Sequence, residues 1–321
     1  MKILLVGSGG REHAIAWKIN QSPRLEKLYV APGNAGTRSV ATNIDIPESD
    51  IQSLKNFALQ EEIDLTIVGP ETPLALGIVD EFMELGLPIF GPTASAARLE
   101  SSKSFAKAVM EKWSIPTGSH EVFSDPQKAV TYLEGLDTFP TVLKADGLAA
   151  GKGVYICQDK SEAMTALNDL MVTKVFGDAG TTLIVEEFLD GWELSAFAFS
   201  DGETTSSLVA ACDYKRIGEG DTGPNTGGMG TYSDSNHSLP FLTKQDIDDA
   251  KTINQATAKA IKNKFDLSYR GILYGGFMLT TNGIKLIEYN ARLGDPEAMN
   301  VLSLLETDFI ELCHAVSYTH L

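Results

Sequence analysis

Cysteine is scarce in this chain, and long apolar runs are missing. The 321 residues include three cysteines, Cys157, Cys212 and Cys313, which lie far apart and without C-x-x-C spacing. An odd, scattered set excludes a disulfide framework and a cysteine zinc site, and is typical of reduced thiols in the cytoplasm. No apolar run approaches the roughly 20 residues of a membrane span, and the apolar start at residues 1–6 is too short for a signal peptide. We therefore expect a cytoplasmic protein without a membrane partner.

Basic residues are also in deficit. The chain has 26 Lys and Arg against 43 Asp and Glu, a net charge of −17. Such a surface repels nucleic acid phosphates, so we expect no nucleic acid partner. It repels small phosphorylated ligands too. If such ligands bind, basic side chains and backbone N–H groups must be concentrated locally and a metal must help.

The first hundred residues alternate short apolar runs with helical patterns. Strands are expected at 2–6, 27–30, 65–68 and 88–90, and helices at 12–20, 50–60 and 74–85. This alternation predicts an α/β domain with a doubly wound parallel sheet. Ligand sites in such sheets lie beyond the carboxyl ends of the strands, which here are rich in glycine and proline.

The remaining chain has a different pattern. A helix at 101–113 leads to strands at 141–145, 154–157 and 182–187 and a helix at 161–171. From residue 192 the pattern becomes mostly antiparallel, with a hairpin at 193–200 and 204–211, a glycine-rich loop at 218–230 and a helix at 244–263. The turn dipeptide Asn282-Gly283 then opens a strand at 284–289.

This last strand carries the most informative side chains. Positions two apart on a strand face the same way, so Glu288, Asn290 and Arg292 would project together if the strand extends that far. A carboxylate and an amide oxygen suit Mg²⁺, and a guanidinium suits a phosphate. The alternative is an edge strand whose polar face is simply solvated.

Two upstream segments suit a nucleotide. Between residues 144 and 154, small residues would let backbone N–H groups surround an anion, and Lys144 could reach the same phosphates. The loop lacks P-loop spacing, because neither Ser nor Thr follows Lys152, and it could be a flexible connection. Glu186 and Glu187 end an apolar strand whose backbone could read an adenine edge, with Glu193 near the ribose. They could equally be surface acids.

Five motifs in order carry a family resemblance. They are Gly9-Gly10-Arg11-Glu12-His13-Ala14, Ala31-Pro32-Gly33-Asn34-Ala35-Gly36-Thr37, the segment 144–153, Asp221-Thr222-Gly223-Pro224-Asn225-Thr226-Gly227-Gly228-Met229-Gly230, and Gly294-Asp295-Pro296-Glu297. The nucleotide segments resemble the ATP-grasp superfamily. The full set resembles the glycinamide ribonucleotide synthetase (phosphoribosylamine–glycine ligase) family, from residue 1 to about residue 316.

The resemblance implies an architecture and a reaction. It implies a Rossmann-like substrate domain over 1–101, an ATP-grasp small lobe with its connecting helix over 102–190, and a central lobe over 191–321. The implied reaction is ATP-dependent ligation of glycine to 5-phosphoribosylamine in purine synthesis, with a glycyl phosphate intermediate and Mg²⁺ or Mn²⁺ as cofactor.

The resemblance also implies roles for individual residues. The metal ligands would be Glu288 and Asn290, and the catalytic residues Arg292 and Asp213. The ATP site would comprise Lys103, Lys144, Gly151, Lys152, Gly153, Glu186, Glu187, Leu189 and Glu193. The glycine and phosphoribosylamine sites would comprise Gly9, Gly10, Arg11, Asn34, Glu71, Asp213, Lys215, Arg216, Asn225, Gly294 and Asp295. Arg11 could instead serve only to cap the first helix.

The chain departs from the family pattern in two places. Many ATP-grasp enzymes supply a further carboxylate from the strand before the E-x-N strand, but residues 275–283 contain none. Family members also continue into another domain after the helix near 308–316. We expect this chain to lack that domain, since residues 317–321 show no family likeness.

Three alternatives remain open. A nicotinamide dehydrogenase would explain the glycines at 7 and 9, but Glu12 occupies the third glycine position of the dinucleotide fingerprint and no acid ends the second strand. Another ATP-grasp ligase, such as a carboxylase of purine synthesis, fits the nucleotide half equally well. The third alternative is a fragment that binds nucleotide without turnover.

Overall fold

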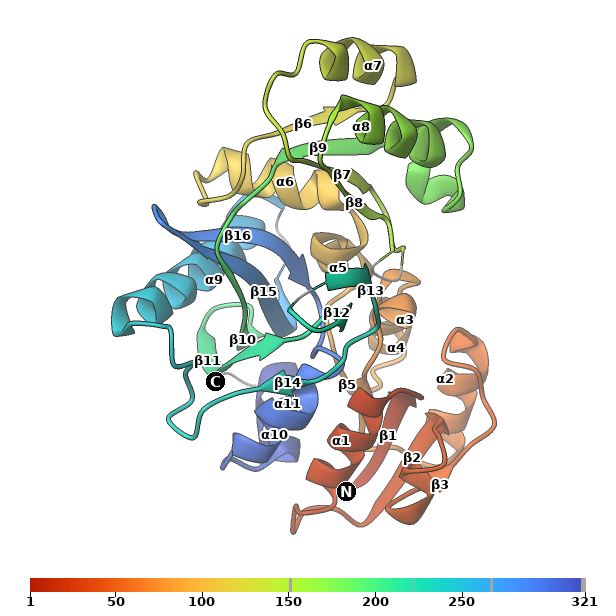
Figure 1. The fold of residues 1–321 in the computed structure, drawn as a ribbon. Helices are drawn as coiled ribbons and strands as arrows, with labels where there is room; N and C mark the ends of the chain where they lie inside the picture. Colours follow the sequence, from red (N-terminus) through yellow and green to blue (C-terminus); the bar gives the residue numbers. More distant parts are fainter. Residues whose placement is uncertain (150–151, 221, 266–267, 319–321) are drawn as a thin grey trace.

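The computed structural model describes residues 1–149, 152–220, 222–265 and 268–318. Three main sheets follow one another along the chain (Figure 1). Each lies within one of the three ranges proposed for the domains, whose boundaries stay a prediction. None of the described helices is long and apolar enough to cross a membrane.

The N-terminal sheet is parallel throughout, as predicted. Its strand order is β3-β2-β1-β4-β5, from β1 (Lys2–Gly7), β2 (Lys27–Pro32), β3 (Thr42–Asn43), β4 (Leu65–Val68) and β5 (Ile89–Phe90). The helices are α1 (Gly10–Ile19), α2 (Ile51–Gln60), α3 (Glu71–Ala75), α4 (Ile78–Glu84) and α5 (Ala94–Ser101). The single helix expected at 74–85 is wrong, because the chain breaks at Gly77, whose φ is +88°.

The small lobe follows α6 (Lys103–Lys112) and is antiparallel. Its strand order is β6-β9-β7-β8, from β6 (His120–Phe123), β7 (Thr141–Ala145), β8 (Val154–Cys157) and β9 (Leu183–Glu187). Helices α7 (Pro126–Glu134) and α8 (Lys160–Leu167) cover one face of this sheet (Figure 1). Sequence reasoning missed β6 and α7.

The central lobe has the antiparallel order β14-β11-β10-β15-β16. Its strands are β10 (Trp192–Asp201), β11 (Thr205–Asp213), β14 (Thr231–Tyr232), β15 (Arg270–Thr280) and β16 (Gly283–Asn290). Its helices are α9 (Lys244–Phe265), α10 (Glu297–Leu304) and α11 (Phe309–Tyr318). The segment expected to be a loop at 218–230 includes part of a two-stranded ribbon, β12 (Arg216–Gly218) with β13 (Thr222–Asn225).

The molecule has three main sheets, but two of its hydrophobic cores are each shared between the N-terminal domain and the central lobe. One core joins Leu4 and Phe82 of the N-terminal domain to Phe277 of β15, and a second joins Ile15 of α1 to Phe309 of α11. The small lobe has a core of its own. The N-terminal domain and the central lobe therefore form one packed body, to which the small lobe is attached by the segments before β6 and after β9.

Candidate active site

A β-bulge decides which way the Glu288 side chain points. Gly276 pairs with Glu288, but the next pair is Phe277 with Leu286, so Ile287 is an extra residue on β16. Regular alternation would put Glu288 on the same face as Leu286, which is fully buried. The extra residue reverses the alternation and turns Glu288 and Asn290 away from the core. Both then share one face, as predicted, whereas Arg292 lies beyond the end of the strand.

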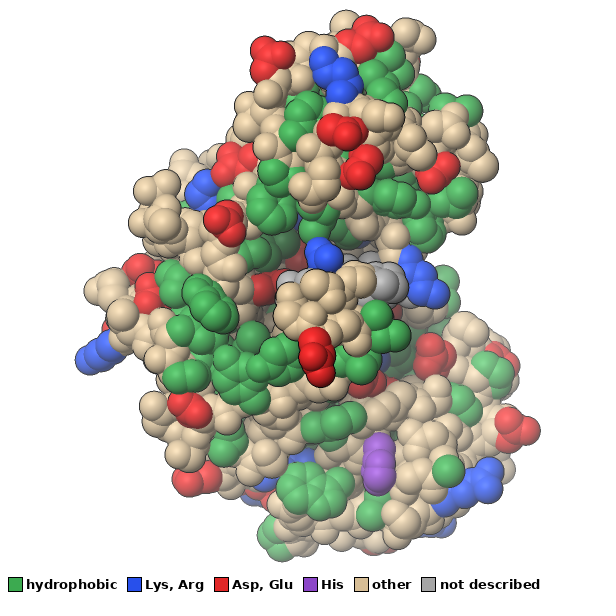
Figure 2. Space-filling model, in the orientation of Figure 1, with side chains coloured by type: hydrophobic (Ala, Val, Ile, Leu, Met, Phe, Trp, Pro, Cys, Tyr) green, Lys and Arg blue, Asp and Glu red, His purple; other side chains and the backbone are tan. Residues whose placement is uncertain are grey.

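Four cations from separate segments of the chain lie near Glu288. Burial acts to raise the pKa of Glu288, but nearby positive charges outweigh it and hold the pKa below the ordinary value. In decreasing order of effect, those charges belong to Lys144, Lys103, Lys215 and Arg292. Figure 2 shows basic side chains, with acidic ones beside them, at the waist between the small lobe and the rest of the molecule. The local concentration of positive charge expected from the sequence is therefore present.

Glu288 and Asn290 suit a magnesium ion. Neither side chain forms a hydrogen bond or ion pair with another described residue, so their oxygen atoms are available to a ligand. The described residues include no cluster of three His, Cys, Asp or Glu that could hold a metal alone. At many nucleotide sites Mg²⁺ is bound by one or two protein oxygen atoms, and water and phosphate supply the other ligands.

Glu186 forms the centre of a buried charged triad. Its Oε2 atom lies 3.0 Å from Lys144 Nζ and 3.1 Å from Lys107 Nζ. Glu186 is only 6% exposed, Lys144 4% and Lys107 2%. Burial acts to raise the pKa of Glu186, but the two ammonium groups hold it below its ordinary value. The Oε1 atom is buried without a hydrogen-bond partner among the described residues, so it can accept a hydrogen bond from a ligand.

Lys107, a member of this triad, was not assigned from the sequence. A signal existed, because Lys107 follows Lys103 by one helical turn and both project from the same face of α6. Lys103 Nζ donates to the Gly147 carbonyl at 3.1 Å, in the loop after β7. Asp146 accepts a hydrogen bond from Ser104 N at 2.9 Å, which ties this loop to the start of α6.

The predicted phosphate loop is described in part. Gly151 lies outside the described residues. Lys152 is exposed, and its N–H donates to the Ala149 carbonyl at 2.9 Å. Gly153 packs closely against Ala145 at the end of β7. The loop thus starts beside Lys144, with an exposed lysine at its other end.

Glu187 points away from the triad. Its carboxylate accepts hydrogen bonds from Ser119 N at 3.0 Å and Ser119 Oγ at 2.6 Å, and Lys285 Nζ lies 2.7 Å away. These contacts overcome the effect of partial burial and lower the pKa of Glu187 to about 2. Its side chain therefore links the lobes at the surface, and Leu189 follows in the connection, half-buried.

Asp213 ends β11, and Lys215, two residues later, pairs with both Asp213 and Glu193 of β10. Lys215 forms a short ion pair with Glu193, and its Nζ atom is 3.9 Å from Asp213 Oδ2. Burial, with Glu297 and Glu193 nearby, raises the pKa of Asp213 to about 6, although Lys215 opposes the shift. A carboxyl group with such a pKa can exchange a proton near neutral pH.

The raised pKa of Asp213 predicts a pH-dependent stability. Between about pH 4 and pH 6 the folded state retains a proton that the unfolded state has lost, so this contribution to stability falls as pH rises through that window. We expect Asp213→Asn to be more stable than the parent by about 1–3 kcal/mol at pH 8. At pH 4 the two should differ little. Urea unfolding at both pH values measures this, and a variant less stable at pH 8 would contradict it.

Glu297 is a second residue that sequence reasoning did not assign, although it ends the fifth motif. Its side chain is 3% exposed and has no cationic partner among the described residues. The Tyr274 hydroxyl donates to Glu297 Oε1 at 2.7 Å, and Ser195 Oγ donates to the Tyr274 hydroxyl at 2.7 Å. This chain of hydroxyls holds a buried carboxylate close enough to raise the pKa of Asp213.

Arg292 lies in a network between the N-terminal domain and the central lobe. Its Nε atom is 3.1 Å from Glu71 Oε2, and its Nη2 atom is 2.8 Å from Glu100 Oε1. Arg11 extends the network, with Nε 2.5 Å from Glu12 Oε1 and Nη1 4.0 Å from Glu71 Oε2. The predicted residues Arg11, Glu71 and Arg292 are thus brought together, with two acids that were not predicted.

Helix α1 begins against the fifth motif. Asp295 Oδ2 accepts a hydrogen bond from Arg11 N at 3.0 Å, so a carboxylate lies at the positive end of the helix. A Cβ atom on Gly9 would lie 2.9 Å from the same oxygen, and one on Gly10 would lie 2.6 Å from Met299 Cε. These glycines allow the two segments to approach closely, and Gly294 directly precedes this contact.

The other predicted substrate residues have mainly local contacts. The Asn34 side chain donates to the carbonyls of Ser8 and Gly9, each at 2.9 Å, and its Oδ1 atom accepts from Gly36 N at 2.7 Å. Arg216 pairs with Asn225 in the β12–β13 ribbon, and Arg216 Nη1 donates to the Gly223 carbonyl at 3.4 Å. Asn34 therefore ties its own loop to the loop before α1 rather than offering a free amide.

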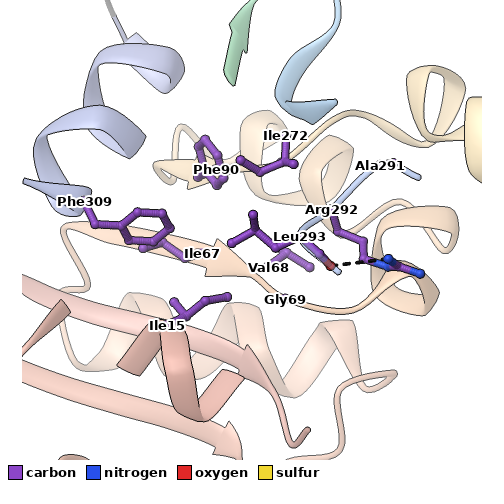
Figure 3. Close-up of a pocket in the computed structure, with 11 residues that line it drawn as sticks. Ile15, Ile67, Val68, Gly69, Phe90, Ile272, Ala291, Arg292, Leu293 and Phe309 are labelled. Atoms are coloured by element: carbon purple, nitrogen blue, oxygen red, sulfur yellow. Dashed lines mark hydrogen bonds between the residues drawn. The ribbon is translucent and has the colours of Figure 1, made fainter. Parts of the chain in front are cut away.

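A small pocket lies behind Arg292 in the packed body (Figure 3). Apart from the Arg292 side chain, which bonds back to the Leu293 carbonyl at 3.3 Å, its lining is apolar. Its volume of about 10 Å³ is no more than a single water needs, so it is a packing gap and not a substrate site. The lining residues are Ile15, Ile67, Val68, Gly69, Phe90, Gly91, Ile272, Ala291, Arg292, Leu293 and Phe309.

Known proteins are similar to this chain in both sequence and fold. Residues 1–100 match the N domain of phosphoribosylglycinamide synthetase, and residues 101–298 match its ATP-grasp (A) domain. The phosphoribosylamine–glycine ligases of Caldanaerobacter subterraneus subsp. tengcongensis and Halalkalibacterium halodurans are 49% and 48% identical over 98% of this chain, which spans 74% and 73% of their lengths.

Solved structures agree with these matches. The crystal structure of phosphoribosylamine–glycine ligase from Thermotoga maritima superposes on all of this chain and 76% of its own, with a TM-score of 0.84 and 32% identity. A biotin carboxylase domain from Hydrogenobacter thermophilus superposes with a TM-score of 0.72 at 15% identity, which supports the ATP-grasp fold alone. The chain belongs to the phosphoribosylglycinamide synthetase family.

Proposed function

We propose that this chain catalyses the ATP-dependent ligation of glycine to 5-phosphoribosylamine, giving glycinamide ribonucleotide, ADP and phosphate in purine biosynthesis. Family membership over residues 1–298 supports the reaction. The single structural observation that carries it is the bulge at Ile287, which directs Glu288 toward four cations.

The chemistry requires an activated carboxylate. A carboxylate oxygen of glycine attacks the γ-phosphorus of ATP, the bond to the bridging oxygen breaks, and ADP leaves glycyl phosphate behind. The amine nitrogen of phosphoribosylamine then attacks the carbonyl carbon, phosphate leaves, and the nitrogen loses a proton. In such a reaction the protein mainly positions the reactants and neutralises charge.

The nucleotide would occupy the space between the small and central lobes. Lys103 and Lys144 neutralise its phosphates, with the loop through Gly153 above them. Glu186 offers its unpartnered Oε1 atom to the exocyclic amine of adenine, and Glu193 faces the ribose. Glu288 and Asn290 would hold Mg²⁺ or Mn²⁺, which when bound neutralises phosphate charge and orients the γ-phosphoryl group.

The acceptor side would lie along the contact of α1 with the fifth motif. Arg292 stabilises charge on the transferring phosphoryl group, and Glu71 beside it suits an ammonium or amine. Asp213 accepts the proton that the attacking amine loses, in keeping with its pKa of about 6. The free state of the described cysteines supports a reducing compartment, and we place the reaction in the cytoplasm.

ADP release from Mg-ATP, glycine and freshly prepared phosphoribosylamine tests the proposal. We expect turnover that requires all three and a product with the mass of glycinamide ribonucleotide. Turnover that depends on bicarbonate would favour another ATP-grasp ligase. Nucleotide binding without turnover would favour a binding fragment, and thermal stabilisation by NADH but not Mg-ATP would revive the dehydrogenase.

A further inference from the structure

The linker between α6 and β6 pairs with the outer edge of β16 just before the bulge. Leu286 N donates to the Pro116 carbonyl at 2.7 Å, and Thr117 Oγ1 donates to the Leu286 carbonyl at 2.7 Å. Because β16 is the edge strand of its sheet, no further strand among the described residues satisfies these two groups. The linker therefore closes the strand edge at the residue where the register shifts.

The Thr117 hydroxyl also contacts the buried charged triad. Lys107 Nζ donates to Thr117 Oγ1 at 2.8 Å, and the same ammonium group lies 3.1 Å from Glu186 Oε2. Lys144 shares that carboxylate oxygen at 3.0 Å. A continuous series of buried and partly buried contacts thus runs from Lys144 through Glu186, Lys107 and Thr117 to the carbonyl of Leu286.

The direction of these hydrogen bonds is fixed by chemistry. An ammonium group can only donate, so Thr117 Oγ1 must accept from Lys107. The single hydroxyl proton is then left for the Leu286 carbonyl. Valine at this position has nearly the same shape but supplies neither the acceptor nor the donor, whereas serine supplies both.

A second link joins the same segments at the surface and provides a matched control. Lys285 of β16 pairs with Glu187 at 2.7 Å, and Glu187 accepts from Ser119 of the linker. This link is more exposed, and it does not contact the backbone of the bulged strand. If the two links contributed equally to the position of β16, loss of either link would change the metal–nucleotide site to the same extent.

We propose that Thr117 is a positioning residue for the metal–nucleotide site: its hydroxyl holds β16 in the bulged register that turns Glu288 and Asn290 toward the ligand. The proposal rests on the proposed function only in requiring that a metal–nucleotide binds between the lobes. It assigns no contact to glycine or to the amine. The hydroxyl acts through the strand and does not touch the substrate.

Calorimetric titration with ADP, in the presence and absence of Mg²⁺, tests the proposal on the full chain. We expect Mg²⁺ to tighten ADP binding by the parent protein, and Thr117→Val to lose about tenfold or more of that enhancement, as when an outer contact of a metal site is removed. Metal-free ADP affinity should change little. Thr117→Ser and Lys285→Gln should both retain the parent's enhancement.

Two results would overturn the proposal. One is a folded Thr117→Val variant with the parent's Mg²⁺ enhancement, and the other is an equal loss in the valine and serine variants. If circular dichroism shows that Thr117→Val does not fold, Thr117→Ala carries the same expectation. ADP binding needs neither glycine nor phosphoribosylamine. A failure of ligase turnover would therefore count against the proposed function, but it would not change the result of the ADP titration.

Discussion

Glu288→Gln should reduce kcat/KM for Mg-ATP by about 10²–10³-fold while the protein remains folded. The carboxylate lies among Lys103, Lys144, Lys215 and Arg292, and its charge makes it a strong ligand for a hard cation. Glutamine keeps the shape but loses the charge. Because the Glu288 side chain has no hydrogen bond to another described residue, its replacement breaks no structural contact.

Steady-state kinetics with varied Mg-ATP, at saturating glycine and amine, measures this effect. Glu203→Gln is a matched control, since it makes the same change in a surface ion pair with Lys262. The control should behave as the parent protein does. A Glu288→Gln variant with undiminished turnover would remove Glu288 from the metal site and would leave the bulge without a functional reason.

Glu186→Gln should cost about 3–5 kcal/mol of stability, because it leaves two buried ammonium groups without their shared anion. Lys107 and Lys144 are both almost completely buried, so water cannot replace the lost carboxylate. The effect should be greatest in the small lobe, to whose sheet Glu186 and Lys144 belong and whose core is separate from the rest of the molecule. Hydrogen exchange during urea unfolding measures the loss lobe by lobe.

The adjacent residue provides the comparison. Glu187→Gln breaks a solvent-accessible pair with Lys285, and such pairs contribute about 1 kcal/mol or less. The two variants make the same change at adjacent positions of β9, but the carboxylate of Glu186 is buried and that of Glu187 is exposed. An equal loss of stability in both would show that Glu186 is not the counterion of a buried triad.

Burial of the polar residues was the least predictable part of the site. Arg292 and Glu71 were expected near the substrates, but their pairing with each other depends on how the central lobe packs on the N-terminal domain. Lys107 was overlooked because a lysine on an amphipathic helix normally faces water. Its partner Glu186 comes from a strand 79 positions later in the sequence.

The sequence by itself determined the parallel N-terminal sheet, the antiparallel C-terminal half and the order of motifs that assigns the family. These features depend on local periodicity and on residue types at fixed spacing, which one chain displays directly. Only the tertiary structure decided that Glu288 turns away from the core and toward the nearby cations. Strict alternation would place Glu288 on the same face as the buried residues Ile284 and Leu286. The only sign in the sequence that the alternation is interrupted is the adjacent apolar pair Leu286-Ile287. The bulge that resolves this conflict depends on β15 and on the Thr117 linker, and contacts so distant along the chain leave no periodic trace in the sequence.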